Sequence, residues 1–231
     1  SWPRFTALRD GQQAFSEFSA HAFTALTLTG RGEPEHLEAM RVTANFFPTL
    51  GVQPRLGRGF TAAEDRAGGA NVVLLSHAFW QRQFAGSPDA VGQSLTLNGT
   101  AYTIVGVLPP SLSFPFAQTQ IWTPRAFEPE GLPPDLIQRG TGYLFVLGRL
   151  KATTSVTQAQ EQLRVLGEQN GIDQWNGSLR DLGVDKVDLL QVHNIRDTDT
   201  HLRTIRRLKD EGKVRYVGIT TSFKNSYDEF E

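Results

Sequence analysis

The chain has no cysteine, and its prolines stop well before its end. Zero cysteines among 231 residues exclude disulfide bonds, thiolate metal sites and a cysteine nucleophile. All 12 prolines lie at or before Pro134. No run of about 18 apolar residues is present, so no stretch predicts a membrane span. A net charge of −1 gives no electrostatic reason to expect a nucleic acid as a partner.

The composition changes near residue 170. The first 169 residues contain 13 basic and 13 acidic residues, whereas the 62 that follow contain 10 and 11. Before the change only one basic residue is a lysine, Lys151, and 13 of the 15 phenylalanines also lie there. Such a change separates segments of different origin. We therefore predict two domains, at residues 1–169 and 170–231. The sequence leaves open whether a natural fusion, an engineered joint or an assembly artefact connects them.

The first segment has the pattern of a mixed α/β domain, with apolar and β-branched runs between glycine and proline stops. The strongest local signal is Asn98-Gly99, which lies between alternating apolar runs and predicts a β-hairpin with a type I′ turn. We expect an edge strand at residues 121–123, before Pro124, and a buried strand at residues 142–150. Further strands are expected at residues 22–29, 41–43 and 72–75.

Helices are expected where a capping residue precedes an amphipathic run. Asn45 and Ser76 are candidate N-caps of two short helices, the first of which should end at Gly51. Thr157 and Gln160 have the spacing of a capping box, in which Gln160 reaches back to the Thr157 amide. A further amphipathic helix should follow that box.

No catalytic constellation is visible in the first segment. His21, His36 and His77 lack the spacing of metal ligands, so we expect surface or packing roles for them. Glu64 and Asp65 are adjacent in a loop rich in glycine and alanine, where a solvated turn is expected. An acid/base pair is the alternative, and it would need a partner that the sequence does not identify.

Ordered motifs give the first segment a family resemblance. The motifs at residues 43–58, at 73–76 with 79–84, and at 97–99 with 102–110 resemble the MacB-type periplasmic core domain, as does the helix expected after residues 148–151. The resemblance implies a non-catalytic domain of an ABC-transporter permease, related to the macrolide exporter and to the FtsX-like permeases. It also implies a two-lobed, porter-like α/β fold with an inserted lobe at roughly residues 70–135.

The same resemblance implies a location and partners. In that family the domain stands on the extracytoplasmic (periplasmic) side of the bacterial cytoplasmic membrane, between the first transmembrane helix and the others. The implied partners are the permease's own transmembrane helices, a cytoplasmic ABC ATPase, a second permease in a homodimer, and a periplasmic partner protein or cargo. No cofactor is implied, and the sequence does not indicate the cargo.

The second segment alternates helix and strand as a parallel βαβ unit does. Residues 187–193 predict a buried strand that ends at His193, and residues 214–220 predict the next strand. A helix is expected between them, over residues 202–211.

Residues 182–194 and 208–220 resemble the aldo-keto reductases, which are TIM barrels that reduce carbonyls with NADP. The resemblance places the catalytic histidine at His193 and contacts to the nicotinamide at Thr220 and Thr221. The family's catalytic Asp, Tyr and Lys have no counterparts here, so a proton donor is lacking. A fragment of an NADP-dependent reductase is therefore the alternative function. The sequence leaves enzyme activity open and favours the non-catalytic transport domain.

Overall fold

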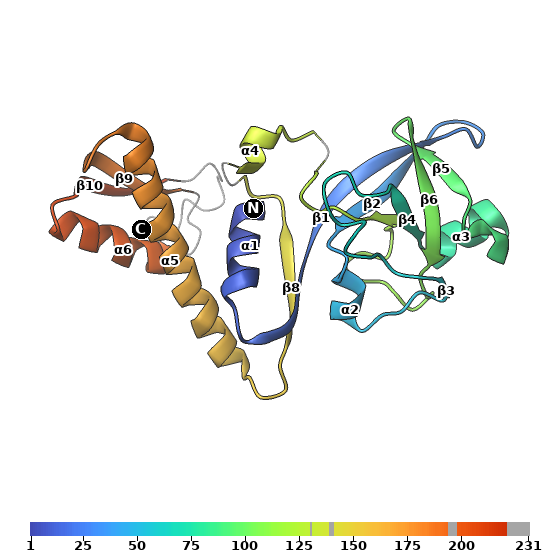
Figure 1. Cartoon of the computed structure of the whole chain (residues 1–231), viewed down its shortest axis with the longest axis horizontal. Coiled ribbons are helices and arrows are strands. Elements are labelled where there is room, and N and C mark those ends of the chain that lie inside the picture. The colour runs from blue at the N-terminus through green and yellow to red at the C-terminus, as the bar shows by residue number, and fades with distance from the viewer. Residues whose placement is uncertain (130, 139–140, 194–197, 221–231) are drawn as a thin grey trace. The chain divides into compact units, whose positions relative to one another are not determined.

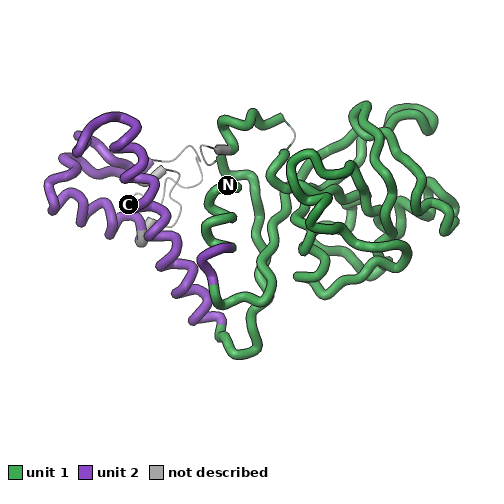
Figure 2. The backbone as a smooth tube through the Cα atoms, in the orientation of Figure 1, with its two compact units in different colours: residues 1–9, 13–155 green, residues 10–12, 156–231 purple. Residues whose placement is uncertain are grey.

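The structure is a computed structural model that describes residues 1–231 apart from residues 130, 139–140, 194–197 and 221–231. The chain divides into two compact units, which Figure 2 colours separately. Unit 1 contains residues 1–9 and 13–155, and unit 2 contains residues 10–12 and 156–231. The change of composition near residue 170 falls inside helix α5 (Val156–Leu182) of unit 2.

Unit 1 is built mainly of strands, with short helices beside them. The strands are β1 (Phe15–Thr29), β2 (Glu35–Val42), β3 (Leu56–Gly57), β4 (Val72–Leu75), β5 (Ser94–Leu97), β6 (Thr100–Val107), β7 (Ile121–Thr123) and β8 (Phe145–Leu150). The helices are α1 (Trp2–Gly11), α2 (Phe46–Leu50), α3 (His77–Phe84), the 3₁₀ turn η1 (Pro88–Ala90) and α4 (Pro134–Gln138).

Among the described residues, six strands of unit 1 close a ring (Figure 1). The order around the ring is β1, β2, β7, β4, β6 and β5, and β5 pairs with β1 again. The pairs β2–β7 and β4–β6 are parallel, and the others are antiparallel. β3 pairs with β6 beside the ring. Because every ring strand has a neighbour on both sides, the ring itself presents no long open edge.

β1 is 15 residues long and belongs to two parts of the unit. Its second half, from His21 to Leu28, pairs with β2 in the ring, whereas its first half, from Phe15 to His21, pairs with β8. β1 and β8 therefore continue beyond the ring as a two-stranded ribbon (Figure 1). The ring of Phe5 in α1 stacks on Phe18 in β1, with centroids 5.7 Å apart, so α1 packs on the ribbon.

Alternate residues of a strand point to opposite sides of its sheet, so a strand whose consecutive residues are all buried is covered on both faces. β4 shows this directly, since all four of its residues are buried. On one side α3 closes a cluster that includes Val73, Leu75, Phe79 and Trp80. On the other side α2 closes a cluster that includes Val72, Leu74, Phe46 and Phe47.

Two local predictions for unit 1 are confirmed. Ser76 caps α3, since its Oγ accepts a hydrogen bond from the Phe79 amide at 3.1 Å. Asn98 and Gly99 connect β5 to β6 with φ angles of 48° and 77°, as a type I′ turn requires. Both signals depend only on neighbours in the sequence, which is why the sequence was sufficient.

Two strands of unit 1 are placed differently from the prediction. β7 is not an edge strand, because it lies between β2 and β4 with all three residues buried. Pro124 follows its last residue and so removes no hydrogen bond from the ladder. β8 is not buried, because it lies at the end of the sheet order beside β1. Phe145 and Val146 are 54% and 41% exposed.

The predicted caps also need correction. Asn45 occupies the N-cap position of α2 but makes no side-chain cap bond, and its amide group donates instead to Glu17 Oε2 at 2.9 Å. Gly51 ends α2 with a φ of 71°, as predicted. Thr157 is not an N-cap, because α5 begins one residue earlier, at Val156.

Unit 2 is the predicted parallel βαβ unit, preceded by α5. β9 (Val187–His193) and β10 (Val214–Thr220) have the predicted bounds and pair in parallel, and α6 (Thr198–Asp210) connects them. Its core includes Trp175 of α5, Leu208 of α6 and Val214 of β10. The prediction that β9 is buried was wrong, since Leu189 is 53% exposed. A sheet of two strands with helices against one face leaves its other face open.

Candidate functional site

Two of the residues that the sequence assigns to a nicotinamide site, His193 and Thr220, lie at the carboxyl ends of β9 and β10. His193 is the last residue of β9, and Thr220 is its register partner on β10. Thr220 is half-buried, whereas the His193 side chain and Thr221 lie outside the described residues. Barrel enzymes hold their substrates at the carboxyl ends of parallel strands. The catalytic role of His193 and the cofactor contacts of Thr220 and Thr221 stay predictions.

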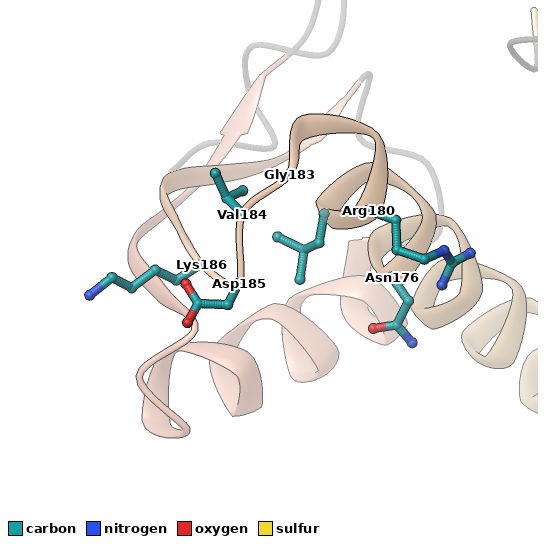
Figure 3. A pocket seen from close by; sticks show the side chains of 7 residues that line it. Asn176, Arg180, Gly183, Val184, Asp185 and Lys186 are labelled. Atoms are coloured by element: carbon teal, nitrogen blue, oxygen red, sulfur yellow. The ribbon is translucent and has the colours of Figure 1, made fainter.

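A hollow of about 840 Å³ lies in unit 2, at the amino end of β9 (Figure 3). It is lined by the end of α5 and the following loop, through Asn176, Leu179, Arg180, Gly183, Val184, Asp185 and Lys186. The Lys186 side chain extends away from the other labelled side chains (Figure 3). The seven residues of β9 place the hollow roughly 20 Å from His193. It is therefore not a cleft for a carbonyl that His193 could polarise.

Glu64 does not lie in a solvated turn, contrary to the prediction. It is buried, and its carboxylate accepts from Arg58 Nη2 at 2.6 Å and from the Thr61 amide at 2.8 Å. Burial alone would raise the pKa of Glu64, but the hydrogen bonds from Arg58 and Thr61 outweigh it and hold the pKa below its usual value. A carboxylate with these hydrogen bonds and a lowered pKa stabilises its loop and is poorly suited to accept a proton.

Asp65 is likewise committed to backbone groups. Its two oxygens accept from the amides of Ala44 and Arg125, each at 2.8 Å. Burial raises the pKa of Asp65 above its usual value, and the two amide bonds oppose that effect. The oxygens of Glu64 and Asp65 are thus bonded to different structural partners, and the acid/base alternative gains no support.

Arg125 completes this network as a clamp between two loops. Its guanidinium donates to the Gly69 carbonyl at 2.7 Å, to Asn71 Oδ1 at 2.6 Å and to Glu128 Oε2 at 2.8 Å. Its backbone has a φ of 67°, a region that non-glycine residues seldom adopt. The hydrogen bonds that Arg125 donates, including the one from its amide to Asp65, offset this strain. They join the segment before β4 to the segment after β7.

The three histidines of unit 1 have separate packing roles, as predicted. His36 Nδ1 is 3.1 Å from Thr27 Oγ1, and the His77 ring lies edge-on to Trp80 with centroids 5.4 Å apart. His21 is buried, and burial lowers its pKa to about 4. Within the described part of the chain, no group of three His, Cys, Asp or Glu residues is placed to hold a metal ion.

The surface of unit 1 carries a feature that the sequence reasoning missed, here named the aromatic face. It consists of the exposed rings of Phe23, Phe114, Phe116 and Phe145. Phe23 lies 5.0 Å from Phe116 and 5.2 Å from Phe145, measured between ring centroids. Beneath them the buried His21 ring stacks on Phe145 at 5.4 Å. The face is therefore continuous and joins β1, β8 and the segment after β6.

A sequence signal for the aromatic face exists in its charge pattern. Residues 18–30 and 90–124 contain no Asp, Glu, Lys or Arg. Such segments normally supply core, and most of their phenylalanines would be assigned to it. Which phenylalanines lie at the surface depends on how β1, β8 and the segment after β6 come together, and no pattern within one segment records this.

Two protein families match the chain. The MacB-like periplasmic core domain matches residues 1–166, and the aldo/keto reductase family matches residues 150–228. Both resemblances read from the sequence are therefore confirmed, and the two matches overlap at residues 150–166, which include the first part of α5. None of the curated proteins compared with the chain matches it significantly.

Solved structures share the fold of unit 1. The periplasmic region of MacB from Actinobacillus actinomycetemcomitans is 14% identical, with a TM-score of 0.55 over 73% of this chain and 72% of that one. The extracellular domain of the noncanonic ABC-type transporter YknZ from Gram-positive bacteria is 15% identical, with a TM-score of 0.52 over 73% and 83%. A domain of a Porphyromonas gingivalis protein assigned as a permease is 16% identical, with a TM-score of 0.52 over 71% and 68%.

The first of these is described as a periplasmic region, and the second as the extracellular domain of an ABC-type transporter. Within the described residues, none of the helices has both the length and the apolar character needed to cross a bilayer.

Proposed function

The chain belongs to the family of MacB-like periplasmic core domains, which its residues 1–166 match, and from this membership we propose its function. Unit 1 is the domain of an ABC-transporter permease that stands on the extracytoplasmic side of the bacterial cytoplasmic membrane. It passes motion driven by a cytoplasmic ATPase to exported cargo or to a periplasmic partner protein, and it needs no cofactor. The family match over residues 1–166 is the observation that carries this proposal.

The state of the polar side chains supports a mechanical role over a chemical one. Glu64, Asp65 and Arg125 form hydrogen bonds that hold loops together. The donor–acceptor distances of these bonds lie between 2.6 and 2.8 Å. A group engaged in this way would have to break a buried bond before it could transfer a proton. What the network provides is stiffness in the loops beside the ring.

β1 offers a path for motion through the unit. It runs without interruption from the ribbon, where it pairs with β8, into the ring, where it pairs with β2. At the junction the Ala20 amide donates to Thr43 Oγ1 at 3.1 Å, and the Ala20 carbonyl accepts from the Thr43 amide at 2.9 Å. A displacement of the ribbon therefore reaches the ring through one continuous strand.

A proline at Ala20 tests this path, because it removes the amide that bonds to Thr43 and disrupts the strand. In vesicles containing the intact permease and its ATPase, Ala20→Pro should abolish transport while ATP hydrolysis continues. The control is Glu33→Pro, which places a proline in the exposed turn between β1 and β2 instead of in the strand. Normal transport by a correctly folded Ala20→Pro permease would contradict the proposed coupling.

The extracytoplasmic location has its own test, which the absence of cysteine makes clean. A single Thr100→Cys substitution places a thiol at the exposed β5–β6 turn. In intact cells, with other permease cysteines replaced, a membrane-impermeant maleimide should label this thiol. Labelling only after the cells are lysed would place the domain in the cytoplasm and overturn the proposal.

The match of residues 150–228 to the aldo/keto reductase family favours a second candidate function, NADP-dependent carbonyl reduction. In this reading His193 polarises the carbonyl, and Thr220 and Thr221 hold the nicotinamide amide. The chain has no counterpart of the family's Tyr proton donor, so a transferred hydride would leave an alkoxide with no acid to neutralise it. We propose that this segment is a TIM-barrel fragment without activity.

A direct assay distinguishes the two candidates. Purified protein with NADPH and a reactive aldehyde should show no protein-dependent loss of NADPH absorbance. Turnover that disappears in His193→Ala and persists in His201→Ala, a matched histidine change on α6, would establish reductase activity instead.

A further inference from the structure

A hollow of about 190 Å³ lies in unit 1 where three segments meet, and it is here named the α3 hollow. It is lined by the start of α3, by Trp122 of β7 and by residues of the segment between β6 and β7. The Ser76 amide donates to the Gln120 carbonyl at 2.8 Å. The Leu108 amide donates to the Leu75 carbonyl, also at 2.8 Å. The walls of the hollow are therefore tied to the strands of the ring.

Trp122 brings a donor without an acceptor to this wall. Its side chain is 2% exposed, and its Nε1 has no hydrogen-bond partner among the described residues. The ring is fixed in the core, because β7 pairs on both sides and the ring lies edge-on to Phe47 with centroids 6.0 Å apart. A buried indole N–H normally has an acceptor. A ligand in the α3 hollow would supply the acceptor that Trp122 lacks.

The start of α3 adds backbone donors to the same hollow. An α-helix leaves its first amides without partners inside the helix, and α3 begins at His77. Ser76 satisfies the later two, since its Oγ accepts from the Phe79 amide at 3.1 Å and its carbonyl accepts from the Trp80 amide at 3.0 Å. His77 and Ala78 both line the hollow, and their amides are the two that Ser76 leaves over. The amino end of a helix with open amides attracts negative charge.

The rest of the lining sets the kind of ligand. Apart from His77, the described residues that line the hollow have no side chain that can carry a charge. An anion therefore meets donors and no repelling carboxylate, whereas a phosphate dianion would find no Lys or Arg to balance its second charge. Leu108 and Leu112 provide apolar walls and pack in the same cluster as Trp122. Since a cavity of about 150 Å³ holds benzene, a hollow of this size admits a ligand of roughly nine non-hydrogen atoms.

We propose that the α3 hollow binds a small carboxylic acid in its carboxylate form. The carboxylate accepts hydrogen bonds from the His77 and Ala78 amides and from Trp122 Nε1, and an apolar group of the acid packs against Leu108 and Leu112. A carboxylate suits these donors because it accepts several hydrogen bonds with a single charge. The site is independent of the proposed transport role, so either can fail without the other.

Sodium benzoate is the probe, because it joins a carboxylate to a ring of the size of benzene. The full chain, labelled with ¹⁵N, is titrated with benzoate at constant ionic strength and followed by NMR. The Trp122 indole proton should shift downfield and saturate, because a hydrogen bond to an anion deshields it. The His77 and Ala78 amides should follow with the same dissociation constant. Trp122→Phe assigns the indole resonance, and a Trp122 resonance without a saturable shift would overturn the proposal.

Two other tryptophans serve as internal controls. Trp80 Nε1 already donates to the Ser87 carbonyl at 2.8 Å, so it needs no acceptor from benzoate. Trp175 Nε1 in unit 2 is buried and, like that of Trp122, has no partner among the described residues. Neither indole should shift. A shift at Trp175 equal to that at Trp122 would show that benzoate acts on unpaired indoles in general, which contradicts a specific site.

Two further probes test the class of ligand. Benzylamine carries a cationic group on the same ring, and it should give no saturable shift at Trp122. Inorganic phosphate should bind at least tenfold more weakly than benzoate, because the lining has no cationic side chain for its second charge. Phosphate that binds as tightly as benzoate, or benzylamine that binds at all, would contradict a carboxylate site.

A pair of substitutions at His77 isolates the contribution of its amide. Ser76 is already extended, with a ψ of 155°, as a residue before proline must be, and proline fits the first position of a helix. His77→Pro therefore removes one donor and should keep the fold, whereas His77→Ala removes the same imidazole and keeps the donor. Benzoate should bind at least tenfold more weakly to His77→Pro than to His77→Ala, at similar melting temperatures. Equal dissociation constants for the two variants would overturn the proposal.

Discussion

At the scale of single residues, His21 differs from Arg125 and Asp65 in its hydrogen bonding. Arg125 and Asp65 have hydrogen-bond partners, whereas His21 Nδ1 has none among the described residues. Its surroundings are the rings of Phe46, Phe114 and Phe145. Such a site accommodates a neutral imidazole and disfavours a charged one.

This gives a prediction for stability against pH. Burial lowers the pKa of His21 to about 4 from 6.5, so between those values the unfolded chain binds more protons than the folded chain. The free energy of unfolding therefore keeps its full value above pH 6.5. It falls by up to about 3 kcal/mol as the pH is lowered toward 4. Urea unfolding of the wild type and of His21→Phe should show a smaller loss in the variant. If the free energy of unfolding depended on pH equally in both proteins, the effect could not be assigned to His21.

Arg125 is the second residue whose role can be measured. Arg125→Ala removes every guanidinium bond and leaves the Gly69 carbonyl and Asn71 Oδ1 without their donor. We expect unit 1 to lose about 3 kcal/mol of unfolding free energy, as buried networks do when one member is removed. Arg125→Lys keeps the charge but not the fork of donors, and should recover only part of the loss. Melting curves that coincide for Arg125→Ala and the wild type would show that the clamp is not needed.

At the scale of elements, the ring closes at one short contact. β5 meets β1 through two register pairs, Leu28–Leu97 and Thr29–Thr96. The β5–β6 turn strengthens this contact, since the Thr27 amide donates to Asn98 Oδ1 at 2.8 Å and the Asn98 amide donates to the Thr27 carbonyl at 2.9 Å. A hairpin turn therefore also holds the ring shut.

Asn98 can be changed so that its two roles separate. Asn98→Ala loses the bond between the side chain and the Thr27 amide, and it forces alanine to a φ of 48°. It should lower the free energy of unfolding by about 1–2 kcal/mol. Asn98→Gly keeps the turn conformation and loses only the side-chain bond, so it should cost less. Hydrogen exchange should accelerate at Thr27 and Leu28 in both variants. Unchanged exchange there would show that the contact does not depend on Asn98.

Sequence patterns predicted where the helices and strands of this fold lie better than they predicted which strands lie side by side. Ser76 and Asn98 act through bonds within a few residues, and the sequence predicts both correctly. The burial of β7 and the exposure of β8 depend on which strands lie beside them, and no local pattern records this. Glu64 was misplaced for the same reason, because its burial is set by the fold of the surrounding loop and by Arg58. Which phenylalanines form the aromatic face likewise depends on how β1, β8 and the segment after β6 come together.

At the scale of the whole molecule, the chain holds two separately packed units. The core of unit 1 contains the clusters around β4, and the core of unit 2 contains Trp175, Leu208 and Val214. In the part of unit 2 that the structure describes, the sheet has two strands, and so small a sheet has little stability of its own. We therefore expect unit 2 to unfold first.

Leu208 provides the test of this order. Leu208→Ala should destabilise unit 2 by about 2–4 kcal/mol through the cavity it leaves, with no change in unit 1. Hydrogen exchange followed by peptide mass spectrometry should show faster exchange in β9 and β10 and unchanged exchange in β4 and β6. Leu74→Ala, in the core of unit 1, should give the opposite pattern. Parallel acceleration in both units for either variant would show one cooperative fold.

The pairing of β1 with β8 has a consequence for how unit 1 bears load. The chain enters β1 and leaves β8 at the same end of the ribbon, where the Lys151 amide donates to the Ala14 carbonyl at 3.0 Å. Tension that pulls these two points apart acts across the ribbon, so its hydrogen bonds break in turn from Phe15–Leu150 toward His21–Phe145. The ribbon should thus unzip at low force and stop at the ring. Unit 1 should therefore yield first at this ribbon when its two chain ends are drawn apart.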